Sequence, residues 1–319
     1  ANGGITNTLK STAPAYYAAY YSCKVVTDYS GGVLNKDYGP YGATIFFGGG
    51  HFSTNENSVY VLENTQKACT WSRKTNPTPI FGSGTDDETK GKNSLTASPV
   101  IGDQVNVTYS EYKIDGQPVS PHSYATPVII PASSGGAAYG TLMTVVSTAG
   151  TFDGYHGSES AHKVDFKSLT DVTTWSRVTD NHGAMSSFAN QSSVILGPPA
   201  WSLFVPTQNR VYYDCHAASR PFGPKWFDLK TNTYVQGTGK ARSNNSDETD
   251  CGAMIDVLSR GMLLFLDPYQ GKLRIEYMDV TANQPSWVCN SVKLSVDLKL
   301  SPGWNAACWC EDNQRIIVG

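Results

Sequence analysis

Short apolar runs separated by turn residues make up most of the chain. Within the stretch 41–75, a first run at 43–47 stops at three consecutive glycines, a second follows at 58–62, and a third at 70–73 contains a tryptophan. Each run is rich in β-branched or aromatic residues and is bounded by turn residues, which predicts a β-strand. Together with an aromatic-rich run at 16–26, they predict a four-stranded unit.

The same succession of runs returns along the chain. Thr-Trp-Ser-Arg at 70–73 recurs letter for letter at 174–177, at the end of a second set of runs. The other runs lie at 126–131, 141–147 and 161–166, at 200–205, 210–214, 225–229 and 233–235, at 252–257, 262–266, 273–277 and 286–288, and at 304–309 and 315–318. No stretch shows a sustained helical period with capping residues, so little helix is expected.

Four-stranded units that repeat every ~40–50 residues and end in a tryptophan-containing strand predict a β-propeller. We therefore expect an all-β fold, a single propeller domain of residues 1–319 with five blades, six being possible. Because the last blade stops halfway, either the N-terminal segment or residues beyond Gly319 would complete it. Residues 1–14 are expected to form an arm or the closing strand, and residues 77–120 an insertion or an irregular blade.

Charge and hydropathy exclude two classes of partner. The formal net charge is -3, and phosphate binding needs a basic face, so no nucleic-acid partner is expected. No run of 18 apolar residues occurs, so membrane insertion is not expected either.

The seven cysteines are an odd number in a chain long enough to fold without a disulfide framework. Buried small apolar cysteines in strands are therefore favoured over one or two disulfides. Cys308 and Cys310 form a CxC pair, which differs from the CxxC of zinc ribbons and redox sites.

The residues of the first unit carry a family resemblance. A strand ending in Gly-Gly-Gly-His at 48–51, a tyrosine-bearing strand at 57–62 and a later Thr-Trp resemble a kelch or galactose-oxidase-like propeller repeat. With the segment 115–124, this variant is similar to kelch-like proteins of bacteria and of their tailed phages. The resemblance covers most of residues 16–318 and is clearest in the first two blades, since later blades lack the paired glycines.

This resemblance implies a non-enzymatic binding propeller in a phage virion or tail. Its partners would be a host-surface glycan or protein and other virion proteins, in recognition or particle assembly. Two alternatives stay open: a secreted galactose-oxidase-like or other carbohydrate-active enzyme, and a purely structural virion subunit. No copper-ligand constellation and no catalytic residue is recognisable, so no cofactor is expected.

Exposed aromatic and histidine side chains on loops are the candidate binding residues, because aromatic faces stack on sugars and proteins while polar tips hydrogen-bond. The candidates are Tyr155, His156, Trp201, His216 and Trp304.

Histidines supply the candidate metal ligands. His51 and His122 follow comparable places in successive blades and are expected to face the central axis, where they could bind metal or hydrogen-bond a neighbouring blade's backbone. The second interpretation is favoured. His156, Glu159 and His162 form an exposed loop cluster whose spacing is a weak metal signal, so no metal site is predicted.

Overall fold

The computed structural model describes thirteen stretches of the chain. They are residues 31–47, 58–65, 69–76, 118, 127–145, 147–149, 156–158, 161–178, 199–215, 223–240, 253–269, 272–292 and 307–318. Contacts divide the chain into two compact units, residues 1–204 and 205–319. In these stretches the helical elements are two 3-10 turns, η1 (Ala132–Ser134) and η3 (Leu258–Arg260), so the all-β prediction is confirmed. No helix in this part of the chain has the length and apolarity to cross a membrane.

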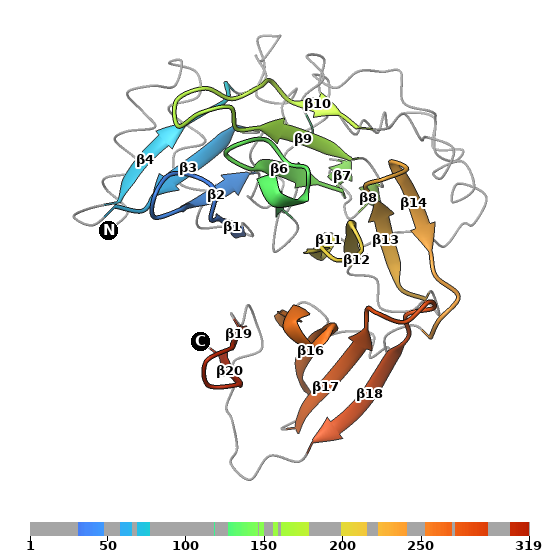
Figure 1. The fold of residues 1–319 in the computed structure, drawn as a ribbon. Helices are drawn as coiled ribbons and strands as arrows, with labels where there is room; N and C mark the ends of the chain where they lie inside the picture. Colours follow the sequence, from blue (N-terminus) through green and yellow to red (C-terminus); the bar gives the residue numbers. More distant parts are fainter. Residues whose placement is uncertain are drawn as a thin grey trace, which may run out of the picture. The chain divides into compact units, whose positions relative to one another are not determined.

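The first sheet is an antiparallel meander of four strands. Its members are β1 (Gly32–Asn35), β2 (Ala43–Phe47), β3 (Val59–Glu63) and β4 (Thr70–Arg73), hydrogen-bonded in that order (Figure 1). In β2, Ala43, Ile45 and Phe47 are fully buried while the residues between them are half-buried, the alternation expected of a strand with one core face.

The second, third and fourth strands of this sheet confirm the predicted runs, whereas its first strand was not predicted. The strand that pairs with β2 is Gly32–Asn35, with Val33 opposite Ile45, and the predicted run at 16–26 lies outside the described residues. A four-residue strand that begins with glycine carries too weak a propensity signal to compete with an aromatic-rich run.

The second sheet repeats this arrangement. Its strands are β5 (Val128–Ile130), β6 (Thr141–Thr144), β9 (His162–Asp165) and β10 (Ser176–Arg177), in the order β10-β9-β6-β5. Two short paired strands, β7 (Ser147–Ala149) and β8 (His156–Ser158), lie between β6 and β9 in the chain. Both copies of Thr-Trp-Ser-Arg contribute to the fourth strand of their sheet, as the repeat predicts.

Two further four-stranded sheets follow. One has the order β11 (Pro199–Val205), β12 (Arg210–Cys215), β13 (Lys225–Asp228) and β14 (Thr233–Gln236). The next has the order β15 (Ala253–Val257), β16 (Met262–Tyr269), β17 (Lys272–Asp279) and β18 (Trp287–Val292). A hairpin of β19 (Ala307–Cys310) and β20 (Arg315–Val318) ends the described chain.

Consecutive sheets are arranged like propeller blades within each unit. The first strands of neighbouring sheets lie beside each other, β1 beside β5 in the first unit and β15 beside β19 in the second. The described residues contain four complete four-stranded blades, so the prediction of five or six is wrong. Within the described residues the fifth repeat contributes the two strands of its hairpin, and of the segment 77–120 only Pro118 is described.

The first two sheets share one hydrophobic core. Its buried members are Tyr38, Ala43, Ile45, Phe47, Val59, Val61, Leu142, Val164, Phe166 and Trp175. The ring of Phe47 in β2 lies 4.6 Å, centroid to centroid, from that of Trp175, just before β10. Tyr38 and Phe166 meet edge to face at 5.4 Å. Aromatic pairs at these distances add attraction beyond the area they bury, so they fix one sheet against the other.

Candidate functional site

Three turns meet at one end of the first two sheets, and we call them together the turn face. They cover residues 36–42 between β1 and β2, residues 131–140 between β5 and β6, and residues 166–175 between β9 and β10. In an antiparallel meander the connection after the first strand and the connection after the third lie at the same end of the sheet. The chain order of the strands therefore places these turns together.

Backbone and side-chain hydrogen bonds hold the turns 36–42 and 131–140 to each other. The Asp37 carboxylate accepts the N–H of Ala132 at 2.7 Å. Asn35, whose side chain is fully buried, donates from Nδ2 to the carbonyl of Tyr139 at 2.9 Å. Gly140 has a φ of +85°, and a Cβ there would lie 2.7 Å from Asn35 Oδ1, so this close approach requires glycine.

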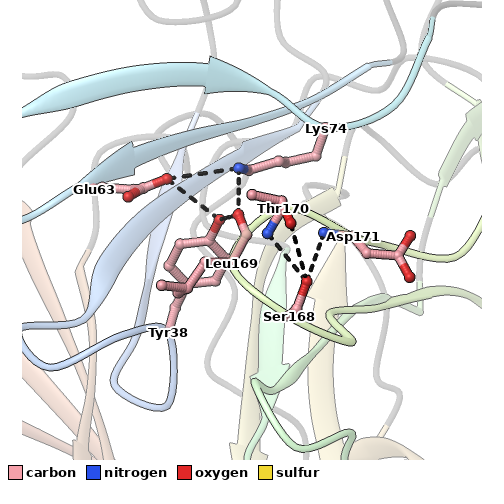
Figure 2. A network of polar contacts seen from close by, with 7 residues as sticks. All are labelled: Tyr38, Glu63, Lys74, Ser168, Leu169, Thr170 and Asp171. Atoms are coloured by element: carbon pink, nitrogen blue, oxygen red, sulfur yellow. Dashed lines mark hydrogen bonds and ion pairs between the residues drawn. The ribbon is translucent and has the colours of Figure 1, made fainter.

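A partly buried polar network joins the first sheet to the turn 166–175 (Figure 2). The carbonyl of Leu169 accepts two hydrogen bonds, one from the Tyr38 hydroxyl at 2.5 Å and one from Lys74 Nζ at 2.7 Å. Lys74 Nζ also lies 3.6 Å from Glu63 Oε1, and its side chain is only 8% exposed. The Tyr38 hydroxyl lies 3.4 Å from the same Glu63 oxygen.

The surroundings of Tyr38 set the pKa of its hydroxyl. Burial raises the pKa of Tyr38 above its ordinary value, and the charge of Glu63 and the hydrogen bond to it raise the pKa further. The phenol therefore stays protonated at neutral pH. It serves as a hydrogen-bond donor between the sheets, whereas a general base or nucleophile needs a pKa shifted the other way.

The turn that carries Leu169 is held in shape by a serine. Ser168 Oγ accepts the N–H of Thr170 at 3.2 Å and that of Asp171 at 2.9 Å (Figure 2). A serine that bonds the backbone two and three residues ahead stabilises a tight turn. The carbonyl of Leu169 thus meets Lys74 and Tyr38 while its side chain is 37% exposed.

Apolar and charged side chains are exposed together on the turn face. Tyr41 is 50% exposed and Leu169 is 37% exposed. A Cβ at Gly39 would touch the Leu169 side chain at 3.4 Å, which places that leucine against the turn bearing Tyr41. Lys167 and Asp171 are exposed as a weak ion pair at 4.0 Å. A mixed patch of this kind suits contact with another macromolecule.

The structure brings none of the sequence-predicted site residues together in the part that it describes. His51, His122, Tyr155, His216 and Trp304 lie outside that part.

Three candidates fall within described strands. His156 belongs to β8, and its side chain is not described. Trp201 lies in β11 and is 4% exposed, so it packs inside the structure, and its predicted binding role stays a prediction. His162 was expected in an exposed loop, which is wrong, because it is fully buried in β9. Its neighbour across the sheet is Thr144 of β6, so strand pairing places it inside.

Two further observations concern metal ligands. No group of three or more histidine, cysteine, aspartate or glutamate side chains in the described stretches is placed to hold a metal ion. The cysteines in these stretches include three free thiols, of which Cys69 and Cys308 are exposed and Cys310 is half-buried. For these three the prediction of burial is wrong.

Sequence reasoning missed the network around Leu169 altogether. Tyr38 and Tyr41 belong to a Tyr-Gly-Pro-Tyr-Gly segment and stand out in the sequence as two of many aromatic residues, with nothing to single them out. Lys74 and Leu169 are 95 positions apart and belong to no motif. A polar network closed between two repeats has no local signature, because its partners become neighbours only when the sheets pack.

Comparisons with known proteins support no family assignment. No family model matches the chain, and no curated protein is similar to it in sequence. Among solved structures, TolB from Acinetobacter baumannii is similar at a TM-score of 0.34 and 9% sequence identity, over 81% of this chain and 45% of TolB. The chain thus spans less than half of that structure. The resemblance to kelch-like phage proteins remains a prediction from the sequence.

Proposed function

We propose that this chain is a non-enzymatic binding protein, a virion or tail component that contacts a protein on the host surface. The resemblance of its repeats to kelch-like phage proteins supports a place in a virion or tail. The turn face supports binding, and it is the observation that carries the proposal. A pair of sheets with a common core holds Tyr41 and Leu169 at its end, both exposed.

The rigidity of the turns favours recognition. The turn of Leu169 is held by a hydrogen bond within it, to Ser168, and by hydrogen bonds from Tyr38 and Lys74 to the Leu169 carbonyl. A surface already ordered before contact loses little conformational entropy on binding, so more of the contact energy appears as affinity. Tyrosine adds a large, stiff contact area with few rotatable bonds.

The composition of the patch favours a protein partner over a glycan. Leu169 offers an aliphatic surface, and Lys167 and Asp171 offer charges of both signs beside it. Tyrosine beside aliphatic residues with a charged rim is the usual make-up of protein interfaces.

The chemistry of the network also favours binding over catalysis. The Tyr38 phenol is held protonated, and the ammonium of Lys74 is occupied by the Leu169 carbonyl and by Glu63. The Tyr38 phenol is therefore not poised to act as a base or nucleophile at neutral pH.

A cell-binding assay tests the proposal. Fluorescently labelled protein is titrated onto a panel of bacterial species, comparing wild type with the double variant Tyr41→Ala/Leu169→Ser and with Leu34→Ser. Leu34 is a matched control, since it is 51% exposed on β1. We expect saturable binding that falls at least tenfold in the double variant and is unchanged in Leu34→Ser.

Treatment of the cells separates the alternatives. Loss of binding after protease treatment supports a protein partner, and loss only after periodate oxidation of surface sugars indicates a glycan and contradicts our choice. Equal binding by wild type and double variant rules out the turn face. If no species binds and the protein is a multimer in solution, the structural virion role replaces recognition.

A further inference from the structure

The hairpin β19–β20 has two faces with different surroundings. Trp309 and Ile316 lie opposite each other and pack on the core of the fourth sheet, which contains Ile255, Val257 and Leu266. Because side chains alternate along a strand, Cys308 and Cys310 must share the other face. Their cross-strand neighbours on that face are Ile317 and Arg315.

The hairpin is fixed on one side by contacts to the turn η3. The Arg260 guanidinium lies 5.6 Å from the centre of the Trp309 ring, and its Nη2 donates to Gln314 Oε1 at 2.6 Å. Ser259 donates to the carboxylate of Glu311 in the turn between β19 and β20. These contacts hold the strand that carries the two thiols in one orientation.

The face that carries the cysteines is open to solvent in the described part of the chain. Ile317 is 54% exposed, Cys308 is exposed and Cys310 is half-buried. Asn313 donates from Nδ2 to Cys310 Sγ at 3.7 Å. Both cysteines are therefore at least partly exposed, and the proposed binding function does not use them.

Strand geometry decides between a disulfide and a shared ligand. Residues two apart on a strand have Cα atoms about 6.7 Å apart. That is at the upper limit of about 6.8 Å for a disulfide, whose preferred separation is about 5.5–6 Å. Both cysteines are free in the structure. Two thiols that project in parallel from one face can instead lean toward a single ion held between them.

We infer that Cys308 and Cys310 form a two-thiolate site that binds a soft monovalent cation, Cu(I). Thiolates select soft ions such as Cu(I) and zinc. Structural zinc requires four ligands, whereas the described face of the hairpin presents two thiols. Cu(I) is satisfied by two thiolates in a linear arrangement.

Charge balance is consistent with this site. Each thiol releases its proton to solvent and forms one Cu–S bond, no electron is transferred, and the copper remains Cu(I). The resulting centre carries one negative charge. Arg315 is the cross-strand neighbour of Cys310 and supplies a positive charge on the same face, while Asn313 donates to the Cys310 sulfur.

Competition with a coloured Cu(I) chelator tests the inference on the reduced full chain under anaerobic conditions. Because seven cysteines are present, the informative quantity is the change in stoichiometry. We expect Cys308→Ser and Cys310→Ser each to bind one Cu(I) fewer than wild type. Cys69→Ser, which also removes an exposed thiol, should bind as wild type does. The same stoichiometry in wild type and in Cys308→Ser/Cys310→Ser would overturn the site.

A second measurement needs no variant and so is independent of folding defects. Wild-type protein is alkylated with iodoacetamide, with and without one equivalent of Cu(I), and the modified cysteines are identified by mass spectrometry. Cu(I) should protect Cys308 and Cys310 together and leave Cys69 reactive. Protection of Cys69 to the same degree, or no protection of the pair, contradicts the inference.

Discussion

Among the described residues, two of the places where neighbouring repeats pack together differ in how many side chains they bury. In the first unit, two complete sheets contribute ten buried side chains to one cluster, drawn from both sheets. In the second unit, the cluster of the fourth sheet against the hairpin β19–β20 has three buried members, with Trp309 and Ile316 only partly buried on it. Both counts refer to the described residues. A blade of four strands offers a full face to its neighbour, whereas a hairpin offers a small one.

Polar contacts follow the same difference. In the first unit the partly buried Tyr38 hydroxyl donates to the Leu169 carbonyl, which also accepts a hydrogen bond from Lys74, whose side chain is 8% exposed. In the second unit the Arg260–Gln314 contact is exposed. A polar group out of water depends on its partner, while an exposed one can turn to solvent. The first packing contact should therefore be sensitive to single substitutions and the second tolerant of them.

The largest effect is expected at the tryptophans of the repeated Thr-Trp-Ser-Arg. Trp175 is 7% exposed and packs on Phe47 of the neighbouring sheet, whereas Trp71 is half-buried and packs on Phe46 of its own sheet. Trp175→Ala should lower the free energy of unfolding by about 3–5 kcal/mol, and Trp71→Ala by about 1 kcal/mol. Urea denaturation of the full chain measures both. Equal losses would mean that Trp175 does not join the sheets.

Removal of the buried ammonium should come next. Lys74→Met deletes the hydrogen bond to the Leu169 carbonyl and the ion pair with Glu63, and should destabilise the protein by about 1.5–3 kcal/mol. Lys163→Met is the matched control, because Lys163 pairs with Asp165 at 3.3 Å while 42% exposed, and pairs of that kind contribute about 0–1 kcal/mol. A similar loss in both variants would show that Lys74 is solvated like Lys163.

Tyr38→Phe should have a smaller effect that depends on pH. Near neutral pH the lost hydrogen bond to Leu169 should lower the free energy of unfolding by about 0.5–1.5 kcal/mol. The pKa of Tyr38 is raised in the folded state, so the folded state keeps its proton longer than the unfolded state. Stability from this group is complete below pH ~10 and declines as pH rises above it.

The alkaline decline identifies the group. Tyr38→Phe should reduce the decline without removing it, because burial also raises the pKa of Tyr212 in β12. Tyr212→Phe should remove a separate part of the alkaline decline in stability. Urea denaturation at a series of pH values between 7 and ~11.5 gives the profiles. An unchanged profile in Tyr38→Phe would show that its hydroxyl is not buried against Glu63.

The smallest effects are expected on the hairpin. Ile316 and Ile317 are adjacent in β20 but face opposite ways, the first partly buried on the fourth sheet's core and the second 54% exposed. Ile316→Ala should cost about 1–2 kcal/mol in the stability of the second unit, and Ile317→Ala no more than about 0.5 kcal/mol. The reverse order would mean that the cysteine-bearing face is covered in solution.

The repeat structure could be predicted from the sequence because it depends on local signals. The runs at 43–47, 70–73 and 262–266 are short, β-branched or aromatic, and bounded by turns, and each is a strand or lies within one. The weak strand Gly32–Asn35 was missed because four residues with a leading glycine carry little propensity. The number of complete blades was overstated, because in the described residues the fifth repeat contributes two strands rather than four.

The candidate site could not be predicted in the same way. The turn face depends on Leu169 reaching Tyr38, which lies 131 positions away, and on Lys74 lying beside both. Sequence patterns report which residues share a strand face, but not which repeats touch. Conversely, the histidine and aromatic residues singled out for their chemistry are mostly outside the described residues, and Trp201 is buried.

The most direct test of the claim that the first two sheets are neighbouring blades with one core is a double-mutant cycle between Phe47→Leu and Trp175→Phe. Since their rings lie 4.6 Å apart across the two sheets, we expect a coupling energy of about 0.5–1.5 kcal/mol. Phe47→Leu combined with Trp71→Phe provides the control and should be additive. Additivity of Phe47 and Trp175 to within about 0.3 kcal/mol would contradict a shared core.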